Sequence, residues 1–393
     1  MNLRQRRVFG VSAGVIIIMG LAFTDRQIAM ADWRTIPTAA IGISSRYDDN
    51  VTSEKSGPND LVTSLNPRLA LSMEQDITKI ETTLTANGEV FSQNSDLNFT
   101  SFGSSVNVTH QINPINQVVF TDSVSYTPET PPPSDSVQSE DGGPVTSPIT
   151  VKRGARISNY GSARLSHRIS PLSSVSVSYG NSLTSFRDPS QVNSTTHSAN
   201  LGLSHHLDRQ TTISENYRFS YFLAKGGDDT QNHNFSIGLA HSLSLSWKFS
   251  GNIGVNYTVQ PDNQTASMSG GLNLSKAVSD QLGMVLSYSA NVSTAGGVSN
   301  DVVRNQVVNL GFNQVLSRFL SASVSARFGD SRSISGNNVE IDSWDANAGL
   351  SYQIGPSISM DANYSHQQQI NNGDLGSDFI RNQYSLSVSA EFL

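Results

Sequence analysis

The fold is decided by one stretch of the chain, Asn382-Gln-Tyr-Ser-Leu-Ser-Val-Ser-Ala-Glu-Phe-Leu393. Every second residue belongs to an apolar row, which consists of Tyr384, Leu386, Val388, Ala390 and Phe392. The residues between them are Gln, Ser or Glu. Strict alternation is the period of a β-strand whose two faces meet different surroundings. This segment is therefore predicted to be a strand with one apolar and one polar face.

The composition of the whole chain fits the same pattern. Of its 393 residues 36% are hydrophobic and only 15% are charged, with a net charge of −7 and no cysteine. Low charge argues against disorder, and the polar residues are mostly Ser, Asn, Thr and Gln that alternate with apolar ones. A membrane β-barrel needs this mixture, because one face of each strand meets lipid and the other meets the lumen. The absence of cysteine excludes disulfides and thiolate sites.

The alternation recurs in about 18 segments. The predicted strands cover 36–47, 61–73, 77–90, 97–110, 117–127, 155–169, 173–186, 195–207, 211–223, 230–243, 245–259, 265–278, 281–293, 301–316, 319–330, 343–354, 357–369 and 379–393. Their connections alternate between short and long, which is typical of an outer-membrane barrel with short periplasmic turns and long extracellular loops. We therefore predict an all-β, transmembrane, antiparallel up-and-down barrel over residues 32–393. A soluble β-sandwich array is the alternative for alternation alone.

Residues 1–31 are predicted to be a cleaved signal peptide. Arg4, Arg6 and Arg7 form a basic start, an apolar run follows, and Ala29-Met-Ala31 has the small-residue spacing of a cleavage site. An N-terminal membrane anchor is the alternative. No later segment has the apolar length of a spanning helix, so an exported membrane protein of this kind is expected to be a barrel in the bacterial outer membrane.

Residues 128–153 interrupt the alternation. This stretch contains Pro131-Pro-Pro133, Gly142-Gly-Pro144 and several acidic residues, so we expect a long loop. It is the third long loop, and its acidity resembles the constriction loop of general diffusion porins. Projection into solvent is the alternative.

The polar faces of the predicted strands carry charges that we expect to line the lumen. The basic ones are Arg46, Arg68, Lys79, Arg164, Arg168, Arg218, Lys248 and Arg327. The acidic ones are Glu81, Asp345 and Asp361, together with Glu74 and Glu391. Other acids, among them Asp48, Glu340 and Asp342, are assigned to loops.

Two interpretations of these charges are open. A mildly basic lumen would concentrate anionic solutes or anionic sugar polymers. Alternatively, the basic residues pair with carboxylates and brace the wall. Glu215 occupies an apolar-row position, which indicates either an interfacial location or a slip of the predicted register.

No motif indicates catalysis, a cofactor or nucleic-acid binding. The chain lacks HExxH, GxSxG and a phosphate-binding loop, and His205-His206 would point to opposite faces of a strand. No basic stripe is present. We expect neither an enzyme nor a metal site.

Several segments carry a family resemblance. Asp32-Trp33, Ile36-Pro37, Arg46-Tyr-Asp-Asp-Asn-Val51 and His197-Ser-Ala-Asn-Leu-Gly-Leu203 resemble β-barrel porins encoded beside exopolysaccharide and exosortase genes. The resemblance implies a conduit for a secreted polysaccharide that works with periplasmic and inner-membrane synthesis and export proteins. A general diffusion porin and a non-channel surface or adhesin barrel are the alternatives.

The closing segment resembles the strand by which the barrel-assembly machinery recognises its substrates. Tyr384, Leu386, Val388 and Phe392 would form that signal and face outer-membrane lipid. The usual signal ends on an aromatic residue, whereas here Leu393 follows Phe392.

Overall fold

The computed structural model describes residues 33–128, 149–150, 153–224, 229–261, 263–295, 298–299, 301–334 and 339–392. The predicted signal peptide, most of the loop 128–153 and Leu393 lie outside these residues. Within the described residues the chain forms eighteen β-strands and one 3-10 helix, Ser95–Leu97. None of the helices so described is long and apolar enough to cross a membrane.

The strands follow one another directly along the chain. Their bounds are β1 Arg34–Asp48, β2 Asp60–Gln75, β3 Thr78–Phe91, β4 Phe99–Asn113, β5 Asn116–Thr127, β6 Arg156–Arg168, β7 Ser173–Phe186, β8 Ser194–His206, β9 Thr211–Ala224, β10 Thr230–Ser242, β11 Trp247–Val259, β12 Gln264–Ala277, β13 Leu282–Thr294, β14 Val302–Val315, β15 Leu320–Ser333, β16 Glu340–Gly355, β17 Ile358–Asn371 and β18 Phe379–Phe392.

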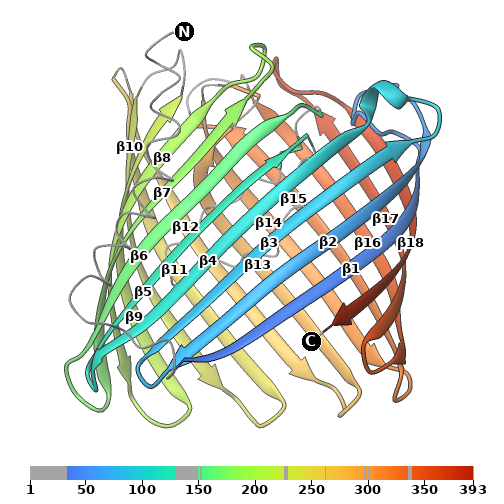
Figure 1. The fold of residues 1–393 in the computed structure, drawn as a ribbon. Helices are drawn as coiled ribbons and strands as arrows, with labels where there is room; N and C mark the ends of the chain where they lie inside the picture. Colours follow the sequence, from blue (N-terminus) through green and yellow to red (C-terminus); the bar gives the residue numbers. More distant parts are fainter. Residues whose placement is uncertain are drawn as a thin grey trace, which may run out of the picture.

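The eighteen strands close into one ring. Each strand pairs antiparallel with its neighbours in the sequence, and β18 returns to pair with β1. At this junction, which we call the seam, Ile41 lies opposite Ala390 and Tyr47 lies opposite Tyr384. Figure 1 shows the ring running from β1 round to β18. A closed ring satisfies the backbone of every strand, as a lipid environment requires. The predicted up-and-down barrel is confirmed.

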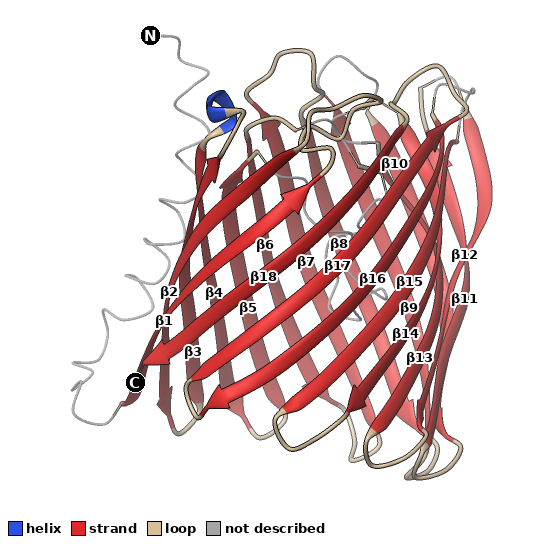
Figure 2. Ribbon diagram, turned by 90° about the vertical axis from the view of Figure 1, so that its right-hand side faces the viewer, coloured by secondary structure: helices blue, strands red, loops and turns tan. Residues whose placement is uncertain are grey.

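The two ends of the barrel differ in their connections, as predicted (Figure 2). At one end the turns are short; Asp76 and Ile77 alone join β2 to β3. In the turn between β8 and β9, Asp208 accepts hydrogen bonds from the backbone N–H of Gln210 (2.6 Å) and the hydroxyl of Thr211 (3.0 Å). These hydrogen bonds to the carboxylate hold the pKa of Asp208 below its ordinary value. The other end, the long-loop end, carries the longer connections.

The apolar rows lie on the outside of the ring. Leu201 on β8 lies between Val177 and Tyr217, and it is 50% exposed. Asn200, the preceding residue of β8, points toward the lumen and is only 7% exposed. Large apolar side chains that remain exposed along every strand form a surface suited to lipid rather than to water.

The outward position of Glu215 is also settled by the register. On β9 it lies between Leu203 of β8 and Ile237 of β10, and the pairing continues without a shift on either side. The alternative of a register slip is therefore wrong. Glu215 lies four residues from the start of β9, closer to the short turns than to the long loops.

Removing Glu391–Leu393 is expected to prevent assembly of the barrel. Two of these residues pair with β1 at the seam, Glu391 with Ala40 and Phe392 with Ala39. Without them the seam loses its terminal pairs and the outward aromatic residue. The measurement is the amount of heat-modifiable, folded protein in the outer membrane, with Glu391→Gln as the full-length control. Normal insertion of the truncated chain would contradict the role of this segment.

Candidate functional site: the lumen wall and its outer mouth

The inner wall of the barrel is a continuous polar surface. Asn200, Arg218 and Asn234 lie side by side on β8, β9 and β10. The Asn234 amide donates hydrogen bonds to Asn256 Oδ1 (2.9 Å) and Ser269 Oγ (2.6 Å) on the next two strands. Such bonds between inward side chains hold the amides and hydroxyls of the wall in place while the lumen stays hydrophilic.

The predicted lumen charges all occupy inward positions of the strand registers, but they do not form one cluster. Each lies beside inward neighbours that are mostly Ser, Thr, Asn or a small residue; Arg68, for example, lies opposite Ala40 and Thr85. The residues placed in this way are Arg46, Arg68, Lys79, Arg164, Arg168, Arg218, Lys248 and Arg327, with Glu81, Asp345 and Asp361.

Some of these charges are braced by a carboxylate. Lys79 Nζ lies 2.6 Å from Glu81 Oε1, two residues along the same strand. Arg327 on β15 lies directly opposite Asp345 on β16. Arg164 instead donates to a hydroxyl, Ser176 Oγ, at 3.3 Å. The bracing interpretation therefore fits one part of the set.

The charges are unevenly distributed around the lumen. Arg164, Arg168 and Arg218 lie on β6 and β9, and the inward positions of β6–β9 contain no Asp or Glu within the described residues. Asp345 and Asp361 lie on β16 and β17. Since β8 and β17 are nine positions apart in a ring of eighteen, these two groups face each other across the lumen. A solute in the lumen therefore meets arginines without inward carboxylates on one side, and on the other side Asp361 and Asp345, the latter opposite Arg327.

The opening at the long-loop end, which we call the outer mouth, contains a buried ion network at the seam. Asp48 is fully buried and accepts hydrogen bonds from Arg381 at 3.0 Å (Nε–Oδ1) and 2.6 Å (Nη2–Oδ2). Gln383 Nε2 also donates to Asp48, at 2.8 Å. Arg46 extends the network, because it lies 3.6 Å from Asp48 and 3.7 Å from Glu89 on β3.

Most members of this network are absent from the sequence-based predictions. Asp48 is assigned to a loop there, and this is wrong: it is the last residue of β1. Glu340 and Asp342 are likewise part of β16. Arg381 could have been predicted to face the lumen, because it alternates in step with the inward residues Gln383 and Ser385 of the closing strand.

The end of the long loop that precedes β6 lies in the same mouth. Thr150 exchanges two hydrogen bonds with the side chain of Gln369 on β17, at 2.9 and 3.2 Å. Ile149 is buried in a cluster with Val303 and Ile341 on the inner faces of β14 and β16.

Arg153 joins this loop to the ion network. Its guanidinium donates to Glu89 Oε2 (3.4 Å) and to the carbonyl of Leu97 (3.1 Å), and it stacks 4.9 Å from the ring centre of Phe91. Loop residues thus contact both β3 and β17, on either side of the seam. Whether the remaining residues of the loop form a constriction stays a prediction, since they are outside the described residues.

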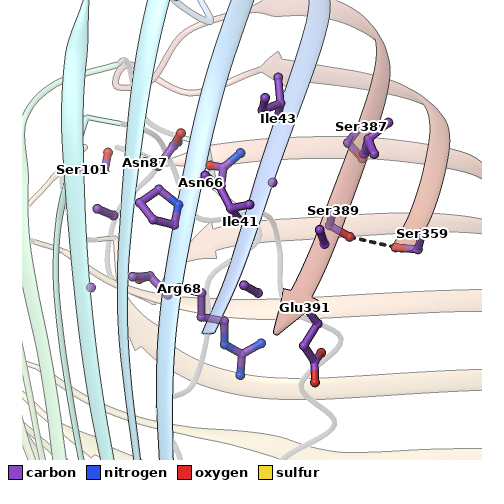
Figure 3. Close-up of a pocket in the computed structure, with 18 of the residues that line it drawn as sticks. Ile41, Ile43, Asn66, Arg68, Asn87, Ser101, Ser359, Ser387, Ser389 and Glu391 are labelled. Carbon is purple, nitrogen blue, oxygen red and sulfur yellow. Dashed lines mark hydrogen bonds between the residues drawn. The ribbon is translucent and has the colours of Figure 1, made fainter. Parts of the chain in front are cut away.

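A cavity of about 700 Å³ opens on the inner face of the seam (Figure 3). We call it the seam cavity. Strands β1–β5 and β16–β18 contribute to it, and most of the side chains at inward positions are hydroxyls and amides, with Arg68 and Glu391 as the charged members. No group of three metal-ligating side chains occurs here or elsewhere among the described residues.

Comparison of the chain with protein-family models and with curated proteins finds no match. Solved structures do match its fold. OccK2 (OpdF) of Pseudomonas aeruginosa, in complex with glucuronate, has a TM-score of 0.52 at 9% identity, covering 91% of this chain and 98% of that one. OccK1 (OpdK) of Pseudomonas aeruginosa, an outer membrane protein, has a TM-score of 0.50 at 11% identity, covering 91% and 99%. The chain has the fold of a bacterial outer-membrane channel.

Proposed function

We propose that this chain is a passive outer-membrane channel for small hydrophilic solutes, with a preference for anions. The observation that carries the proposal is the inner wall, which is polar around a closed ring of eighteen strands. Rings of 16–18 strands are wide enough to leave an aqueous channel. Amide and hydroxyl groups that already bond to one another offer a solute many weak contacts, as with Asn234 and Ser269. Weak contacts permit passage without trapping.

The anion preference rests on the wall formed by β6–β9. Its inward face carries four arginines, Arg156, Arg164, Arg168 and Arg218, and no carboxylate among the described residues. A charged wall raises the local concentration of the opposite charge inside a confined space. A protein of the same fold, OccK2, has been solved with glucuronate, a sugar acid, which supports a small anionic solute here.

Replacing Arg164, Arg168 and Arg218 together with Ser is expected to shift the ion selectivity toward cations. The three substitutions remove positive charge from one wall of the lumen, so the anion-to-cation permeability ratio should fall by about twofold or more. The measurement is the reversal potential across a planar bilayer under a salt gradient.

A matched control is Lys276→Ser. Lys276 lies on the outside, 4.6 Å above the ring of Trp247, so its loss removes one positive charge without touching the lumen. An unchanged reversal potential in the triple variant would contradict the assignment of these arginines to the conducting path.

Export of a secreted polysaccharide is the second candidate, and the even Ser and Asn lining favours it because a polymer must slide past without a strong site. The end of the long loop in the outer mouth weighs against it, since Ile149 and Thr150 lie on the inner faces of β14–β17. This reduces the open section available to a bulky chain.

Two experiments separate the candidates. Liposomes that contain the purified barrel should swell in pentoses and hexoses, and more slowly as the solute grows to a trisaccharide. Absence of swelling for every solute, with folded protein in the liposomes, would sink the first candidate. Deletion of the gene tests the second: unchanged surface polysaccharide would sink it.

A further inference from the structure

The seam cavity contains one cation and one anion that are not paired with each other. Arg68 of β2 and Glu391 of β18 both lie opposite Ala40 of β1, one from each side. Their Cα atoms are thus two strand spacings apart, about 10 Å. Figure 3 shows the two side chains at the same end of the cavity, on either side of β1.

Small residues on β1 keep the space between these charges open. Ala40 and Gly42 are the inward residues of β1 at this level, and both line the cavity. Larger residues there would separate Arg68 from Glu391. The open space between Arg68 and Glu391 is therefore due to the small side chains of β1.

Two basic residues on strands that line the cavity are engaged elsewhere. Lys79 is joined to Glu81 at 2.6 Å, and Arg46 belongs to the ion network of the outer mouth. Neither Arg68 nor Glu391 has a side-chain hydrogen bond or an ion pair with any described residue, and no other charged residue lines the cavity. Both side chains are exposed to the lumen.

The rest of the lining can bind polar groups but does not add charge. Asn66, Asn87 and Ser101 lie on the β2–β4 side, and Ser387 lies on β18. Ser359 and Ser389 are joined by a hydrogen bond of 2.8 Å at the edge of the cavity, which Figure 3 marks. Amides and hydroxyls suit the peptide or hydroxyl groups of a small solute.

We infer that the seam cavity is a binding subsite for small zwitterions that carry one carboxylate and one ammonium group, such as amino acids or short peptides. The guanidinium of Arg68 binds the carboxylate, because its planar fork matches two carboxylate oxygens. The carboxylate of Glu391 accepts hydrogen bonds from the ammonium group. A zwitterion that bridges the two satisfies both charges at once, whereas a simple anion or cation satisfies only one. The inference rests on the proposed function, because a solute reaches this site through the lumen.

The test measures binding directly on the full-length barrel, folded in detergent, by saturation-transfer NMR. The probes are glycine, β-alanine, 4-aminobutyrate and 6-aminohexanoate, which differ only in the distance between their charges. Acetate and methylammonium are the single-charge probes, and glycerol is the neutral one. One member of the amino-acid series should bind best, and each single-charge probe should bind at least about tenfold more weakly, because it satisfies only one of the two charged side chains.

Variants tie the binding to the two residues. R68Q and E391Q should each weaken binding of the best zwitterion about tenfold or more. The charge-swapped double variant R68E/E391R should restore it, because a zwitterion can bind in the reverse direction. K276Q, which neutralises a charge on the outer face of β12, is the control and should leave zwitterion binding unchanged.

Failure of the zwitterion subsite and failure of the channel proposal give different results. Equal binding of acetate and the amino acids, or unchanged binding in R68Q and E391Q, would overturn the zwitterion subsite even if the barrel conducts. Zwitterion binding by a barrel that passes no solute in the liposome assay would sink the proposed function and leave the subsite standing. Folding of each variant is checked by heat modifiability before binding is compared.

Discussion

Asp48→Asn is expected to lower the free energy of unfolding by about 3–5 kcal/mol, the range measured when one partner of a buried ion pair is removed. Asp48 is fully buried, and Arg381 is only 6% exposed. The substitution keeps the shape of the side chain but leaves the Arg381 guanidinium without its carboxylate. Removing the carboxylate of a buried ion pair takes away the main compensation for the desolvation of the remaining charge.

The position of this pair makes its effect larger than that of an isolated interaction. Arg381 belongs to the last strand and Asp48 to the first, so the pair bonds across the seam that closes the ring. Arg46 and Glu89 connect it to β3, and Arg153 connects it to the long loop. We therefore expect the outer mouth to open before the rest of the barrel in the variant.

The measurement is urea unfolding of the barrel refolded into lipid bilayers, followed by tryptophan fluorescence. Lys79→Gln is the control, because its partner Glu81 is exposed and such pairs contribute at most about 1 kcal/mol. The double variant D48N/R381Q should recover part of the loss, since it removes both buried charges. A single variant D48N as stable as the wild type would contradict the role of the network.

Val324→Arg is expected to cost about 1–2 kcal/mol, whereas Ser323→Arg, one residue away, should cost little. The cost for Val324 is moderate because it lies four residues from the short-turn end of β15, and the cost of an outward Arg falls from the bilayer midplane toward the interface. Val324 points outward and is 53% exposed, so its replacement places a charge in the apolar lipid belt. Ser323 points inward and borders a cavity of about 570 Å³ beside Asp361, which can accept the longer charged side chain. Adjacent residues of a strand face opposite sides, and this makes the two variants a matched pair.

The same unfolding assay compares the two substitutions. A midpoint that falls for Val324→Arg but not for Ser323→Arg supports the assignment of inner and outer faces. The reverse order would show that the polar row faces lipid, and the lumen residues discussed above would then be misassigned.

The strands of the barrel could be predicted because lipid imposes a simple pattern. Rows such as Tyr384, Leu386 and Val388 must be apolar wherever they cross the membrane, so a period of two is visible in the sequence. Even Glu215, whose charge disagreed with this pattern, lies where the alternation placed it.

The pattern fails where the strands continue beyond lipid. Asp48, Glu340 and Asp342 were assigned to loops because the apolar row stops before them, yet the strand pairing continues through these residues. Outside the membrane an outward side chain need not be apolar, so only the hydrogen-bonded pairs mark the strand. Alternation alone does not report these pairs.

The sequence predicted individual lumen residues of the candidate site, but not which of them lie next to one another. Alternation identifies Arg68 and Arg46 as inward residues, but it does not show that Arg68 faces Glu391 across Ala40. Those residues lie at opposite ends of the chain, and only closure of the ring with a fixed register brings them together. The same holds for Asp48 and Arg381.

The most direct test of a channel is the conductance of the purified barrel in a planar bilayer. The wild type should produce discrete current steps of uniform size that increase in proportion to the salt concentration, as an aqueous lumen requires. Folded, membrane-inserted protein that produces no current steps at any voltage tested would contradict an open channel.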